Sequence, residues 1–166
     1  MSETPIPSPQ QKIVSCGLSN FLADRRQRII SEWMNFVLRD VKVPAADDLT
    51  YKQLQDHMPQ ILDELNNTLN DAFDLEVKER LAWRAKFHSQ IRWQQDYDIS
   101  QLIREIGDLR TVLIRHLSDY HEDRVPNFNG EAGLFAMIVV HSFFDRLIRI
   151  SVEEFLAFSR AIQKPK

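Results

Sequence analysis

The sequence predicts an all-α protein, a bundle of about five helices with a four-helix-bundle-like core and a long protruding C-terminal helix. Three observations favour this fold. A chain of 166 residues is long enough for one domain with a single core. With 43% apolar and 27% charged residues it has a globular composition, and 4 glycines and 7 prolines are too few for many β-turns. Apolar residues also recur at helical spacing in several segments.

The N-terminal part and the first helix are predicted as follows. The Pro and Ser content near the N-terminus indicates a disordered lead over residues 1–18, so the helical domain is expected over residues 19–163. This lead lacks the basic start and apolar core of a signal peptide. From about Asn20 to Leu38, apolar residues at three- and four-residue steps predict the first helix. Pro44 lies in the loop that follows.

The second and third helices are predicted from capping and periodicity. Thr50 is expected to cap a helix whose apolar line runs from Leu54 to Leu69. Pro59 interrupts this line, and because proline lacks an N–H and crowds the residue four before it, we expect a kink or a new helix start there. The third helix is expected over about residues 75–93.

The last two helices are the longest. Asp98 and Gln101 resemble a capping box and predict a fourth helix that continues to about Tyr120. Inside it, Gly107 costs ~1 kcal/mol relative to alanine, which either close approach of a neighbouring helix or chance explains. After a loop around Pro126, residues 131–162 predict one helix. At about 1.5 Å per residue the fourth helix spans ~33 Å and the last ~48 Å, so the last is expected to project by ~15 Å.

The last helix carries more apolar surface than one core-facing side requires. Its apolar residues fall along two stripes. One stripe contains Leu134, Ile138, Ile148, Val152 and Phe155. The other is assigned to a dimer or relay surface and consists of Met137, Val140, Phe144, Leu147 and Phe158.

Charge and cysteine content argue against several classes of partner. The net charge is -3, with 21 basic residues scattered among 24 acidic ones, so neither nucleic acid nor an anionic membrane surface is an expected partner. The longest apolar run, Leu134–Val140, is far shorter than the ~20 residues of a spanning helix, so no membrane insertion is expected. Cys16 is the single cysteine, which suits a reducing compartment and a cytoplasmic location.

The segment from His88 to Arg110 carries the most specific pattern. His88 and Arg92 have i and i+4 spacing and share one helical face. If the third and fourth helices fold back around Tyr97, His88 lies near the level of Glu105. The spacing alone allows two interpretations, a buried polar network or a solvated face whose ion pairs contribute about 0 to 1 kcal/mol.

This pattern resembles a known family of input domains. The order H-x3-R, an aromatic turn residue and L-x2-E-x3-L-R is carried by His88, Arg92, Tyr97, Leu102, Glu105, Leu109 and Arg110. It is similar to the N-terminal sensory domains of RsbRD-type stress-signalling proteins and of many bacterial sensor histidine kinases. The likeness covers about residues 20–160, and it departs at Asp96, where the family commonly has glycine.

The resemblance favours a buried network of His88, Arg92, Tyr97, Glu105 and Arg110. It implies a non-catalytic sensor domain, most often that of a histidine kinase. We expect the last helix to pair with its copy in a homodimer and to relay small shifts to a C-terminal kinase or other output domain.

Other interpretations of the chain remain. The run from His121 to Pro126 mimics the phospho-acceptor box of histidine kinases, but loop residues follow it at once. His116 and Glu122 belong to a set of metal-ligand types whose spacing matches no known site. Without catalytic motifs we expect no enzyme activity, metal or cofactor. The alternatives are a small-molecule module, with haem near His57 or His88 as one case, and a scaffold of a stressosome-like assembly.

Overall fold

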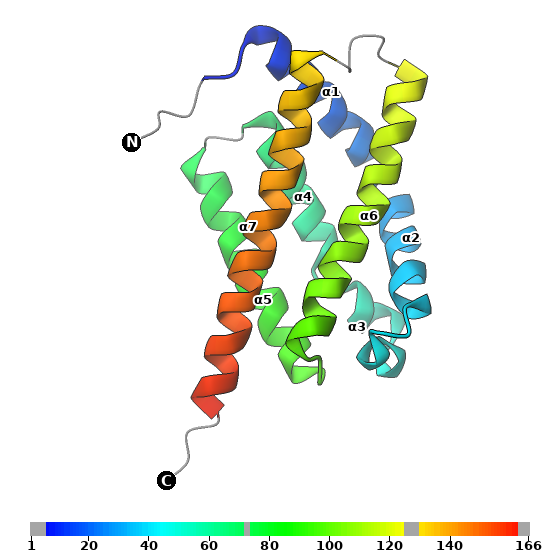
Figure 1. Ribbon diagram of the computed structural model, residues 1–166, viewed down its shortest axis with the longest axis vertical. Coiled ribbons are helices and arrows are strands. Elements are labelled where there is room, and N and C mark those ends of the chain that lie inside the picture. Colours follow the sequence, from blue (N-terminus) through cyan, green and yellow to red (C-terminus); the bar gives the residue numbers. More distant parts are fainter. Residues whose placement is uncertain (1–5, 72–73, 125–129, 163–166) are drawn as a thin grey trace.

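The protein is a bundle of helices, as the computed structural model in Figure 1 shows for residues 6–71, 74–124 and 130–162. Within these residues there is no strand, which confirms the predicted fold class. The elements are α1 (Pro9–Asp24), α2 (Arg26–Arg39), the 3-10 helix η1 (Pro44–Asp48), α3 (Tyr51–Gln55), α4 (Met58–Asn70), α5 (Leu75–Gln94), α6 (Ile99–Arg124) and α7 (Glu131–Ile162). The predicted number of about five helices was too low.

Helix α1 accounts for part of the difference between the predicted and the observed number of helices. Ser8 and Gln11 form a capping box, in which the Gln11 N–H donates to Ser8 Oγ and the Ser8 N–H to Gln11 Oε1, and Pro9 occupies the first turn. Leu18 is fully buried. The prediction of a disordered lead over residues 1–18 is therefore wrong for residues 9–18, while residues 1–5 lie outside the described part.

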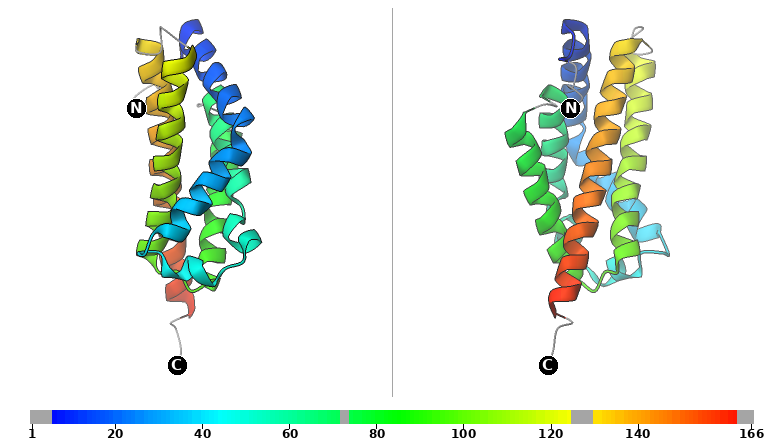
Figure 2. Two further views of the ribbon diagram at one scale, coloured as in Figure 1. Left: turned by 90° about the vertical axis from the view of Figure 1, so that its right-hand side faces the viewer. Right: turned by 60° about the vertical axis from the view of Figure 1, so that its left-hand side comes forward.

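The predicted first helix is in fact two segments. Helix α1 ends at Asp24 and α2 begins at Arg26, with the backbone of Arg25 leaving helical geometry between them. Figure 2 shows α1 and α2 following each other along one side of the bundle, so the break lets them follow the core.

The proline prediction in the second helix is confirmed. Thr50 caps α3 in a capping box with Gln53, and α4 begins at Met58 with Pro59 in its first turn. Between the two helices Asp56 has a φ of 38°, a left-handed value that is uncommon for a residue with a side chain.

The α5–α6 hairpin has the predicted form. Asp74 caps α5 by accepting a hydrogen bond from the Glu76 N–H at 2.7 Å. Asp96 adopts a φ of 61° in the turn, so aspartate occupies the left-handed position where the resembled family has glycine. Asp98 then accepts from the Gln101 N–H at 2.9 Å and begins α6, as predicted.

Helix α7 packs against α1, α4, α5 and α6, and its C-terminal end projects past the other helices (Figure 1). The projection is shorter than predicted. The rings of Trp93 and Phe158 are 5.5 Å apart, so α7 passes the end of α5 by about one turn. Helix α6 has 26 residues and α7 has 32, a difference of about 9 Å rather than ~15 Å.

Gly107 and Gly17 differ in what lies beside their Cα atoms. A Cβ added to Gly107 would meet nothing within 4 Å, so close packing does not explain that residue. A Cβ added to Gly17 would lie 2.7 Å from Tyr120 Oη. The hydroxyl of Tyr120 on α6 therefore reaches the α1 backbone at Gly17, a residue that the sequence analysis had not singled out.

None of the helices in the described ranges has both the length and the apolar character needed to cross a membrane.

Candidate functional site: a buried polar network

The centre of the network is an ion pair between Arg92 of α5 and Glu105 of α6. Both side chains are 0% exposed. Arg92 Nε donates to the two carboxylate oxygens at 3.1 and 2.9 Å, and Nη2 donates to Oε1 at 2.6 Å. Such a bidentate, fully desolvated pair is stable only when its remaining donors are satisfied.

The remaining donors of Arg92 are satisfied by α3 and by the α5–α6 turn. Nη1 donates to the Gln53 carbonyl at 3.0 Å and to Gln95 Oε1 at 2.6 Å, and Nη2 donates to the Leu54 carbonyl at 2.6 Å. The carbonyls belong to the end of α3, where a helix lacks internal partners and a cation is favourable. One guanidinium thus holds α3, α5 and α6 together.

His88, Asp56 and His57 extend the network to the strained α3–α4 junction. His88 is fully buried, and its Nδ1 makes a long contact of 3.4 Å with Asp56 Oδ2. His57 Nδ1 contacts the other carboxylate oxygen. Burial alone would raise the pKa of Asp56, but the hydrogen bond from His88 and the charges of His88, Arg92 and His57 hold this pKa below its ordinary value.

Tyr97 and Trp33 are the aromatic residues that contact the network. Tyr97 is buried with its ring 5.2 Å from Arg92 Cζ, and burial together with the charge of Glu105 raises the pKa of its hydroxyl. Trp33 Nε1 donates to the Glu105 carbonyl at 3.2 Å. Because Arg92 and Glu105 are closed to solvent, this arrangement is suited to holding helices in register rather than to acting on a substrate.

The structure brings together four of the five residues predicted for this network. Arg110 lies elsewhere: its Nη1 is 3.5 Å from Asp145 Oδ1 of α7, on the surface of the α6–α7 pair. The sequence analysis missed Asp56, Gln53, Leu54 and Gln95 as members. The one local signal for Asp56 was its place just before the predicted break at Pro59.

The residues predicted for a dimer or relay surface on α7 are not exposed. Val140, Phe144 and Leu147 are buried in the core, and Met137 and Phe158 are half-buried. A surface made of these five residues is therefore not available to a partner. The large apolar residues of α7 that are exposed are Leu134, Ile138, Leu156 and Ile162, of which the first two belong to the other stripe.

Three contacts connect the network to α7, and all lie beside His88 and Arg92 on α5. Ser89 Oγ donates to the Ser151 carbonyl at 3.0 Å, and Gln90 Nε2 donates to Glu154 Oε1 at 2.9 Å. The third contact is the ring pair of Trp93 and Phe158. Helix α5 thus contacts the polar network with one face and the C-terminal part of α7 with another.

Comparison with protein-family models, curated proteins and solved structures finds no match to this chain. The resemblance to RsbRD-type sensory domains therefore stays a prediction made from the sequence.

His116 and His121 are the histidines of the possible metal-ligand set and the phospho-acceptor-like run. The buried His116 is paired through Nε2 with Glu32 Oε2 at 2.9 Å. The side chains of His121 and Glu122, and Pro126, lie outside the described part. Among the described residues no group of three or more His, Cys, Asp or Glu side chains is placed to hold a metal ion.

Asp108 of α6 is a further buried acid, in addition to Glu105 and Glu64. It is 7% exposed, and its Oδ2 has no hydrogen-bond partner. Burial raises its pKa to about 6, helped by the nearby charges of Asp40 and Glu105 and opposed by Arg104.

Stability is expected to depend on pH through Asp108. The folded-state pKa of about 6 exceeds the ordinary value of 3.8, so folding favours the protonated form. This contribution is fully present below about pH 4 and is lost as the pH rises through 6. In urea unfolding, Asp108→Asn should match the parent protein near pH 4 and exceed it by about 1–3 kcal/mol near pH 8. An equal difference at both pH values would show that the carboxyl does not titrate in this range.

Proposed function

We propose that this chain is a non-catalytic, cytoplasmic sensor or regulatory domain of a bacterial signal-transduction protein, with a histidine kinase as the output. The observation that carries the proposal is the desolvated Arg92–Glu105 pair, which joins three helices and lies next to the contacts with α7. The H-x3-R and L-x2-E-x3-L-R pattern that indicated this pair is the one that resembles RsbRD-type sensory domains.

The proposed mechanism is a shift of the C-terminal part of α7. The guanidinium donors of Arg92 are all satisfied, although His88 Nε2 and Tyr97 Oη have no partner. The Arg92–Glu105 pair therefore has few intermediate arrangements, because a half-broken pair leaves buried charges unpaired. A stimulus that rearranges Arg92 therefore moves α5 by a discrete step. Ser89, Gln90 and Trp93 transmit this movement to Ser151, Glu154 and Phe158.

A homodimer is part of the proposal, with an interface different from the one first predicted. Leu134 and Ile138 are 62% and 53% exposed on successive turns of α7, so they offer apolar surface to a second copy. Phe144 and Leu147, in contrast, stabilise the single chain from inside.

Hydrogen exchange tests the connection between the network and α7. In Glu105→Gln, which weakens the ion pair while keeping the side-chain shape, we expect faster amide exchange in residues 151–158 than in residues 132–140 of the same helix. A merely global loss of stability would accelerate both segments equally, and that result would contradict the relay. Glu153→Gln is the matched control, because the pair of Glu153 with Arg149 is exposed and should leave exchange in both segments unchanged.

A further inference from the structure

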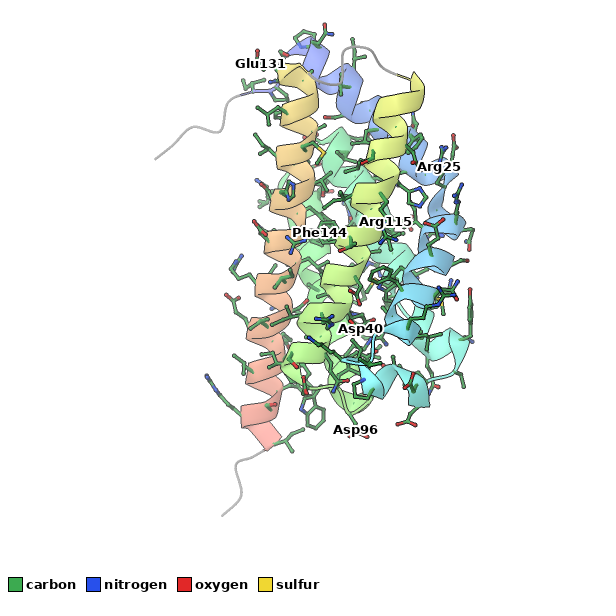
Figure 3. The ribbon with its side chains drawn as sticks, turned by 45° about the vertical axis from the view of Figure 1, so that its right-hand side comes forward. Arg25, Asp40, Asp96, Arg115, Glu131 and Phe144 are labelled. Carbon is green, nitrogen blue, oxygen red and sulfur yellow. The ribbon has the colours of Figure 1, made fainter. Side chains whose placement is uncertain are left out.

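A groove lies between α2 and α6, on the side of the molecule shown in Figure 3, where Asp40 and Arg115 are labelled. Its volume is about 520 Å³, within the range of small-molecule sites. Charged residues line it from both helices. They are Glu32, Arg39 and Asp40 on the α2 side and Arg104 and Arg115 on the α6 side.

Both carboxylates of the groove already have partners. Asp40 is paired with Arg104 and also accepts a hydrogen bond from the Lys42 N–H at 3.0 Å. Glu32 accepts from Arg28 Nε at 2.8 Å through one oxygen and contacts His116 Nε2 at 2.9 Å through the other. Neither acid is therefore free to neutralise a further cation.

Arg39 and Arg115 face this groove from opposite helices without a carboxylate partner among the described residues. The guanidinium of Arg115 lies over the ring of Phe36, with 5.1 Å between Cζ and the ring centroid, which restricts where it can point. The chain has three more acidic than basic side chains, 24 against 21, so acids are not scarce. Two unpaired arginines across one groove leave positive charge there.

We propose that the groove between α2 and α6 binds the phosphate group of a small molecule, held between Arg39 and Arg115. A guanidinium donates two parallel hydrogen bonds to an oxyanion. A carboxylate offers a single pair of oxygens and one negative charge to such a fork, whereas a phosphate monoester has three terminal oxygens and about two negative charges, so a phosphate suits two forks from opposite sides better. Arg104 also lines the groove, but its charge is balanced by Asp40, so Arg39 and Arg115 carry the proposed site.

The groove also lies next to the polar network. Arg104 precedes Glu105 in α6, and Trp33, which follows Glu32 in α2, donates to the Glu105 carbonyl. A bound phosphate would therefore touch the two helices that position Glu105. The inference rests on the groove alone and does not depend on the proposed signalling function.

Calorimetric titration of the whole chain at low ionic strength tests this site, with inorganic phosphate and glycerol 3-phosphate as probes. We expect saturable binding of one equivalent, and Arg39→Gln and Arg115→Gln should each weaken it by about tenfold or more. Both side chains are exposed, so circular dichroism should show unchanged folding. Arg160→Gln, an exposed arginine on α7 outside the groove, is the matched control and should bind as the parent does.

The outcomes separate the possible sources of the phosphate group. Tighter binding of glycerol 3-phosphate would indicate an organic phosphate, and equal binding would indicate free phosphate, and either supports the proposal. No saturation of either probe below about 10 mM would overturn it. Equal weakening by Arg160→Gln, or acetate binding as tightly as phosphate, would also overturn it.

Discussion

Glu105→Ala is expected to lower the free energy of unfolding by about 3–5 kcal/mol, because it leaves the charge of Arg92 buried without a counter-charge. Both side chains are closed to solvent, and Arg92 would keep only its neutral acceptors on Gln53, Leu54 and Gln95. Urea denaturation followed by circular dichroism measures the loss, as a shift in midpoint at constant slope.

Two further variants test whether the unpaired charge of Arg92 is what lowers the stability of Glu105→Ala. Glu153→Ala removes an exposed partner of Arg149 and should cost about 0–1 kcal/mol. Replacing both members of the buried pair, as Arg92→Met with Glu105→Leu, should recover much of the loss, because no buried charge remains. If Glu105→Ala costs less than about 0.5 kcal/mol, the pair is solvated and the network does not hold the helices together.

Phe144→Ala should destabilise the protein by about 3–5 kcal/mol, since it removes a large side chain from a packed core. Phe144 is 0% exposed and its ring packs against that of Phe143 at 5.5 Å. Because the loss arises within one chain, the free energy of unfolding should change equally at low and high protein concentration. Thermal or urea unfolding at two concentrations measures this.

Leu134→Ala, on the exposed side of α7, is the control that matches Phe144→Ala. It should leave the stability of a single chain nearly unchanged and, if Leu134 lies in the proposed homodimer interface, lower the mass measured by light scattering at high micromolar concentration. A fall in mass for Phe144→Ala without loss of stability would instead restore the first prediction, in which Phe144 faces a partner. A monomer for the parent protein under the same conditions would remove the homodimer from the proposal.

Two prolines show what local sequence can and cannot predict. Pro59 interrupts an apolar line, which predicts a kink or a new helix start, and the structure has a helix start there. Pro9 lies in a Pro- and Ser-rich stretch, a composition that indicates disorder, although it occupies the first turn of α1. The capping box of Ser8 and Gln11 was the signal that would have corrected this, since it satisfies donors at a helix start.

The candidate site was also predictable only where its residues are related by local spacing. His88 and Arg92 share a helical face, and a hairpin around Tyr97 brings Glu105 within reach. Spacing alone left a buried network and a solvated face open, and the family resemblance favoured the network. Asp56 contacts His88 across a separation of 32 residues, and no local rule relates positions that far apart. The carbonyls of Gln53 and Leu54 are backbone groups, which a search for charged side chains does not consider.

The helical fold class, most helix boundaries and the sharing of one face by His88 and Arg92 followed from composition, capping and periodicity, which act over a few residues. Which face of α7 is buried was decided by packing. Periodicity shows which side chains share a side of a helix, but the number of neighbours on each side depends on where distant segments fold. Four helices surround α7, so Val140, Phe144 and Leu147 became core while Leu134 and Ile138 remained exposed.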